Sequence, residues 1–181
     1  TEMQKAKWHS LLKTYYYLLG DNDNSQVHLR HFLRHINAPV ISENNLQAIS
    51  GILLQIGQQF MHRVFPDRFV GTRELPEFNH FMYTALINAS VVYQHQGKML
   101  QAIYAMLLSL NTVERIKPHK RMSPAMTYAA FTYLTGMMNM HGLAQRYYDL
   151  AQDAIPPDFP PLIQKQTQAL LGFYHAQRAE W

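Results

Sequence analysis

The chain has 181 residues, of which 48% are hydrophobic and 15% charged, so its composition is that of a folded globular domain and not of a disordered segment. It contains no cysteine, which excludes disulfides, thiolate metal sites and cysteine nucleophiles and favours a cytoplasmic location. The net charge of +4 is small and the basic residues are dispersed, which argues against a nucleic-acid-binding surface. No apolar run approaches the roughly 20 residues that span a bilayer, so the sequence predicts no membrane span.

The N-terminal third of the chain reads as three helices. Apolar residues at three- and four-residue spacings predict helices over 2–19 and about 25–37. A longer helix is predicted over about 43–64. The apolar side of this long helix is expected to face the core, and it consists of Leu46, Ile49, Ile52, Leu53, Ile56, Phe60 and Val64.

The remainder of the chain also reads as helices, separated by segments that contain proline or glycine. A loop is predicted over 65–76, framed by Pro66, Gly71 and Pro76. Further helices are predicted over about 77–95, 98–116, 124–140, 143–154 and 162–178. No segment shows the alternation of a strand, so we predict a single all-α domain over 1–181 with about eight helices.

Most of the predicted helices fall into antiparallel pairs joined by short turns, as in helical-repeat solenoids. Ala102 and Ala144, which lie 42 residues apart, take the same position in their pairs, and Ser25 fits that position in the first pair. The pattern resembles the tetratricopeptide repeat, which implies small residues where paired helices cross. The pairs are about 2–37, 77–116 and 124–154, with an extra helix about 43–64 and an unpaired last helix about 162–178. The unpaired helix and the missing initiator methionine suggest a fragment of a longer chain.

Five stretches in collinear order resemble a region of large signalling proteins. They are "YYYLLGDNDNSQVHLRHFLRHINAPV" (15–40), "QFMHRVFPDRFVG" (59–71), "YAMLLSLNTVERI" (104–116), "YYDLAQDA" (147–154) and "LLGFYHAQRAEW" (170–181). They resemble the tetratricopeptide-like helical region that follows the AAA-like (STAND) ATPase module in class III adenylate or guanylate cyclases and in protein kinases. The resemblance implies a regulatory segment of a multidomain signal-transduction protein. It transfers no active-site residue, because the phosphate loop, cyclase carboxylates and kinase motifs are absent from these stretches.

We therefore interpret the chain as a non-catalytic protein-interaction region, without a cofactor, that binds a protein segment or the parent protein's own catalytic module. The predicted groove is lined by the first helix of each pair, with Thr84, Ile87, Val91, Gln94, His95, Met126, Ala129, Tyr133 and Met137. One alternative is a small-ligand or metal sensor with its pocket between the long helix about 43–64 and its neighbours. Another is a free-standing tetratricopeptide adaptor or chaperone.

Three histidines form a weak candidate metal site. At 100° per residue His28, His31 and His35 share one stripe of their helix, so three imidazoles could meet one zinc ion. The neighbouring Arg30 and Arg34 disfavour a cation. The competing interpretation, which we prefer, is a solvated and partly basic helix face.

The sequence "HRVFPDRF" (62–69) allows two interpretations. Arg63 and Arg68 could bind a carboxylate or phosphate bidentately. Alternatively, the aromatic residues and Pro66 form a packed elbow. We prefer the elbow and retain the two arginines as a possible anion contact.

Overall fold

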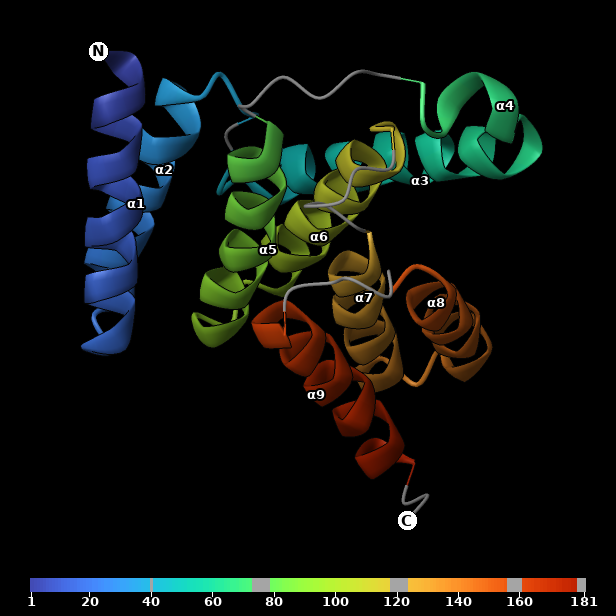
Figure 1. Ribbon diagram of the computed structural model, residues 1–181. Coiled ribbons are helices and arrows are strands. Elements are labelled where there is room, and N and C mark those ends of the chain that lie inside the picture. Colours follow the sequence, from blue (N-terminus) through green and yellow to red (C-terminus); the bar gives the residue numbers. More distant parts are fainter. Residues whose placement is uncertain (40, 73–78, 118–123, 156–160, 179–181) are drawn as a thin grey trace.

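The computed structural model describes residues 1–39, 41–72, 79–117, 124–155 and 161–178, without the side chains of 79–81, 83, 84, 162 and 163 (Figure 1). The described residues are almost entirely helical and contain no β-strand, which confirms the all-α prediction. The helices are α1 Glu2–Leu18, α2 Asn22–His35, α3 Asn45–Val64, α4 Pro66–Phe69, α5 Asn79–His95, α6 Met99–Glu114, α7 Ala125–Met137, α8 His141–Asp153 and α9 Pro161–Gln177. Only the four-residue α4 was not expected, because it lies in the predicted loop. None of the described helices is long and apolar enough to cross a membrane.

Three helix pairs, α1–α2, α5–α6 and α7–α8, pack along their lengths (Figure 1). The turn inside each pair contains one residue in the left-handed conformation. These residues are Gly20 with φ 76°, Gly97 with φ 71° and Asn139 with φ 57°. Glycine and asparagine are the residues that adopt this conformation at least cost, and it ends a helix sharply enough for the chain to reverse.

The small residues predicted at the helix crossings are all buried. Ser25, Ala102 and Ala144 are each at most 2% exposed. Their short side chains allow the paired backbones to approach closely. The hydroxyl of Ser25 also donates a hydrogen bond of 3.0 Å to the backbone carbonyl of Lys13, which ties α2 to α1.

The apolar core has two main parts, which meet at α6. One part joins α1, α2, α5 and the beginning of α6. The other joins the middle of α6 to α7, α8 and α9, with Met106, Leu107 and Leu110 of α6 at its centre. The helix α6 therefore contributes to both parts of the core.

The last helix, α9, packs against α7, and α3 runs crosswise behind α5 and α6 (Figure 1). The Phe173 ring of α9 lies 6.1 Å from the Tyr133 ring of α7. A Cβ added at Gly136 would lie 2.8 Å from the Tyr174 ring, so this glycine permits the close approach of α9. The helix predicted to be unpaired therefore covers part of α7.

Candidate interaction groove beside α3

The long helix α3 faces the opposite way from the sequence prediction. Its buried residues are Ala48 and the polar residues Gln55, Gln59 and His62. Six apolar residues that were expected in the core are between 42% and 77% exposed. We call these six the outward stripe of α3: Leu46, Ile49, Leu53, Ile56, Phe60 and Val64. Only Ile52 of the predicted apolar side packs against a core.

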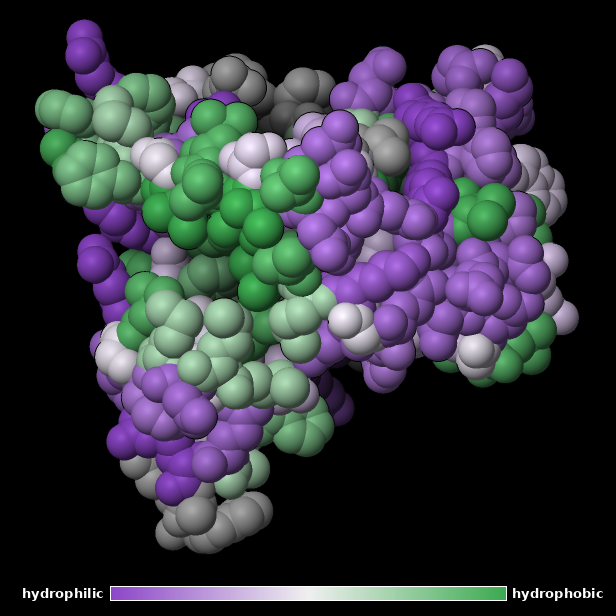
Figure 2. Space-filling view, turned by 180° about the vertical axis from the view of Figure 1, so that it is seen from behind, coloured by the Kyte–Doolittle hydropathy of each residue, from purple (hydrophilic) through white to green (hydrophobic). Residues whose placement is uncertain are grey.

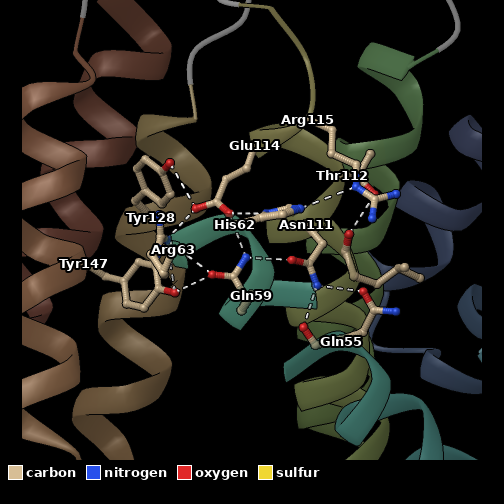
Figure 3. Close-up of polar contacts among 11 residues, drawn as sticks. Gln55, Gln59, His62, Arg63, Asn111, Thr112, Glu114, Arg115, Tyr128 and Tyr147 are labelled. Atoms are coloured by element: carbon tan, nitrogen blue, oxygen red, sulfur yellow. Dashed lines mark hydrogen bonds and ion pairs between the residues drawn. The ribbon is translucent and has the colours of Figure 1, made fainter. Parts of the chain in front are cut away.

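The buried side of α3 is polar because α6 offers it polar partners. The amide of Asn111 donates hydrogen bonds of 2.9 and 2.8 Å to the carbonyl and side-chain oxygens of Gln55. The amide of Gln59 donates one of 2.7 Å to the side-chain oxygen of Asn111. Buried amides are tolerated only when such bonds are made. The pairing of these amide groups therefore fixes the orientation of α3 (Figure 3).

The carboxylate of Glu114, at the end of α6, is the centre of this network. Its side chain is fully buried. It accepts hydrogen bonds from His62 Nδ1 at 2.8 Å and Gln59 Nε2 at 2.7 Å. It also accepts one from Arg63 Nη2 at 2.6 Å and one from the Tyr128 hydroxyl at 3.2 Å. One carboxylate thus joins α3, α6 and α7 (Figure 3).

The network extends to α8 through Tyr147, whose hydroxyl donates a hydrogen bond of 2.9 Å to Gln59 Oε1. Arg63 lies 5.7 Å from the centre of the Tyr147 ring. Burial raises the pKa of Tyr147, and burial together with the charge of Glu114 raises the pKa of Tyr128. For Arg63, burial lowers the pKa, but the Tyr147 hydroxyl and the Glu114 carboxylate outweigh it and raise the pKa overall. Both tyrosines are therefore neutral donors, and Arg63 is a permanent cation.

Next to this network, an open groove of about 680 Å³ lies between α3, α6, α7 and α8. Its lining is mostly apolar and includes Ile56, Phe60 and Val64 of the outward stripe. The cations Arg63 and Arg146 also line it, and its described lining contains no acidic residue. The full lining is Ile56, Gln59, Phe60, Arg63, Val64, Ile103, Leu107, Phe131, Leu134, Thr135, Met138, Met140, Leu143, Arg146 and Tyr147. Figure 2 shows hydrophobic side chains gathered around a hollow on this face of the molecule.

The groove predicted along α5 and α7 is only partly an open surface. Ile87 and Ala129 are buried, so they belong to the core and do not line a groove. Gln94 and Met137 come together, with 3.4 Å between Nε2 and Sδ. The remaining predicted residues differ in exposure: Val91, Met126 and Tyr133 are half-buried, His95 is exposed, and the side chain of Thr84 lies outside the described residues. The Tyr133 ring also lies next to the Phe173 ring of α9, so the last helix borders this face. A partner at this place stays a prediction.

The three predicted histidines do gather, and His9 of α1 joins them. The Nδ1 atoms of His9 and His28 lie 2.9 Å apart, and the His9 ring stacks on His31 and His35 with centroids at 4.9 and 5.3 Å. The Nδ1 of His35 donates to Glu2 at 2.6 Å. No group of three potential ligands in the described part of the chain has the geometry to hold a metal ion. The cluster is therefore a contact between α1 and α2, and no metal is assigned to it.

We expect this cluster to make the α1–α2 contact sensitive to acid. Burial, and then the charges of His31, His28 and His35, lower the pKa of His9. A base whose pKa is lowered by folding loses its contribution to stability as the pH falls through its unfolded value, near 6.5. The protection factors of the α1 amides, which correct for the slower intrinsic exchange at low pH, should therefore fall between pH 7.5 and 5. The change should be smaller in His9→Gln, while the exposed control His141→Gln should behave as the wild type. An equal fall of the protection factors in His9→Gln would contradict this assignment.

The two arginines of "HRVFPDRF" lie in different environments. Arg63 already pairs with Glu114, so an anion at Arg63 would have to compete with an internal carboxylate. Arg68 is exposed on α4. The elbow is partly packed, because the Phe69 ring stacks on His62 with centroids at 6.2 Å, whereas Phe65 is 46% exposed.

Comparison with known protein families, curated proteins and solved structures finds no match for this chain. The sequence did not single out Glu114, which organises the site, because a lone glutamate inside an apolar helix carries no motif. It also did not indicate that α3 is turned outward.

Proposed function

We propose that this chain is a non-catalytic protein-interaction region of a larger signal-transduction protein, and that its binding site is the groove beside α3. The pairing of the helices and the buried small residues at their crossings support a tetratricopeptide-like array. The resemblance to the helical regions of cyclases and kinases with an ATPase module supports a cytoplasmic signalling context. The bound element is a segment of a partner or of the parent protein's own catalytic module.

The outward stripe of α3 is the observation that supports this proposal most strongly. Its spacing of three and four residues, from Leu46 to Val64, is that of a helix-packing face. Burying a large apolar side chain contributes about 1.5–3 kcal/mol of favourable free energy, which is absent when the side chain stays in water. Contiguous exposed patches of this kind mark interaction sites. The polar side of α3 cannot exchange places with the stripe, because its amides and His62 are bonded to α6.

The shape and charge of the groove favour an acidic amphipathic helix as the bound element. One apolar face of such a helix packs between the outward stripe and the ends of α7 and α8, as in other helix-in-groove complexes. Arg146 is exposed and Arg63 is partly exposed at the groove, and none of its described lining residues is acidic. An acidic residue on the bound helix therefore finds complementary charge.

The proposal is tested with synthetic amphipathic peptides of about 20 residues. One carries leucines at three- and four-residue spacings and glutamates on its other faces. The second has lysines in place of the glutamates, and the third is a scramble of the first. By fluorescence anisotropy, we expect the glutamate peptide to bind with a Kd of about 10 µM. We expect the scramble not to bind. Phe60→Glu should weaken binding at least tenfold, because Phe60 lines the groove.

Two further variants make this test specific. Arg146→Glu should weaken the binding of the glutamate peptide and strengthen the binding of the lysine peptide, because the substitution reverses the charge at this position of the groove. Leu18→Glu is the matched control, since Leu18 is 77% exposed on α1, away from the groove. Equal binding of all three peptides, or equal loss in Leu18→Glu and Phe60→Glu, rules out the groove as the site. Self-association that Phe60→Glu abolishes, without peptide binding, assigns the stripe to a second copy of the chain instead.

A small-ligand sensor is the second candidate function, and the size of the groove favours it. About 680 Å³ lies within the range of ligand pockets, roughly 300–1,000 Å³. Its position between α3 and its neighbours is that of the pocket considered from the sequence. A thermal-shift screen with small amphiphilic acids, together with elemental analysis for a metal, separates this function from peptide binding.

A further inference from the structure

A largely buried lysine, for which the described residues supply no counter-charge, lies at a second hollow in the molecule, distinct from the groove beside α3. Lys13 of α1 is 6% exposed. Within the described part of the chain, its ammonium forms no ion pair or hydrogen bond. Burial lowers the pKa of Lys13 to about 8. The Lys13 ammonium keeps some contact with solvent, but a charge confined in this way loses much of its hydration, and no group among the described residues replaces it.

Lys13 lines a pocket of about 290 Å³ between α1 and α5. The other lining residues are Thr14, Tyr17, Leu18, Asn88, Val91 and Val92. None of these described lining residues has an acidic side chain. The side-chain amide of Asn88 forms no hydrogen bond with the described residues. The pocket thus combines one cation, one available amide and an apolar wall.

We propose that this pocket binds a small carboxylic acid whose carboxylate pairs with the Lys13 ammonium and whose short apolar chain packs against Val91 and Val92. A carboxylate supplies the missing counter-charge, and it can also accept a hydrogen bond from the Asn88 amide. The pocket volume lies at the lower limit of ligand sites, about 300 Å³, which suits an acid with few heavy atoms. The binding site does not depend on the function proposed for the groove beside α3, since none of its residues lines that groove.

The proposal is tested with butyrate as the probe. NMR follows the Lys13 Nζ and the methyl groups of Val91 and Val92 during titration of the whole chain. We expect saturable shifts at Val91 and Val92 and an upward movement of the Lys13 pKa when butyrate is bound. Acetate should bind at least tenfold more weakly, because it lacks the apolar chain. The neutral 1-butanol should bind at least tenfold more weakly, because it lacks the charge.

Two substitutions make the result decisive. Lys13→Met should lower butyrate affinity at least tenfold while the fold, checked by circular dichroism, is kept. Asn88→Asp places a carboxylate in the same pocket as Lys13, so it should raise the Lys13 pKa without ligand and weaken butyrate binding. Unchanged butyrate binding in Lys13→Met overturns the proposal. Equal shifts with inorganic phosphate reveal an unselective anion effect and also overturn it. An ordinary Lys13 pKa in the free protein shows that the ammonium is hydrated and overturns it as well.

Discussion

Glu114→Gln is expected to lower the free energy of unfolding by roughly 3 kcal/mol. Glutamine keeps the shape of the side chain but removes the charge that balances Arg63. It also brings an amide that donates into a site where His62, Gln59 and Tyr128 all donate. Unpaired buried donors and an uncompensated buried cation are both destabilising. We place the loss at the low end of the usual range because the Arg63 side chain remains 26% exposed.

Urea denaturation followed by circular dichroism measures this change. The matched control is Glu2→Gln, in which an exposed carboxylate that pairs with Lys5 and His35 is removed. We expect the control to unfold at nearly the same urea concentration as the wild type, because exposed ion pairs contribute little. If both variants unfold alike, Glu114 is not the centre of a buried network, and the orientation of α3 has another cause.

Lys13→Met is expected to have the opposite effect and to stabilise the protein by about 2 kcal/mol at pH 7. The methionine side chain has a similar length and no charge to desolvate. Because the Lys13 pKa is about 8 when folded and 10.5 in its ordinary state, the penalty in the wild type is fully present below pH 8. Between pH 8 and 10.5 the unfolded chain binds a proton that the folded chain does not bind, so stability rises with pH.

The same experiment therefore has a second readout. The wild type should gain stability on the order of 3 kcal/mol from pH 8 to 10.5, in addition to any change shared by all variants. Lys13→Met should lack this gain. Lys7→Met, at an exposed position of the same helix, should retain it. A wild type and a Lys13→Met variant with parallel stability profiles would show that the Lys13 ammonium is solvated in the folded protein.

The two effects have one origin, which is the cost of placing charge in a helical core. Glu114 is buried with a cation and three further donors, so its removal destabilises the fold. Lys13 is largely buried and has no counter-charge among the described residues, so its removal is expected to stabilise the fold. A residue that lowers stability without a structural purpose is often part of a binding site. This contrast is why the pocket at Lys13, and not Glu114, is proposed to bind a ligand.

The sequence by itself determined the helices and their pairing. Apolar spacing located α1, α2 and α5–α9 to within a few residues, because a 3.6-residue period repeats along each segment. The small residues Ser25, Ala102 and Ala144, which the sequence predicts at the crossings, are buried, and short side chains are the ones that fit where backbones approach closely. These are local or pairwise properties, and each depends on residues within one helix or one hairpin.

Only the tertiary structure decided which side of α3 faces inward and which charges are balanced. The α3 sequence has an apolar side and an amide-rich side, and its period does not indicate which of them meets the core. That choice depends on Asn111 and Glu114, more than 50 residues away on α6. In the same way, His9 joins the histidines of α2 only because separate helices meet, and the same is true of Lys13, which the described lining of its pocket leaves without a counter-charge. The strength of a buried polar contact depends on what surrounds it in space, and a linear pattern does not contain that information.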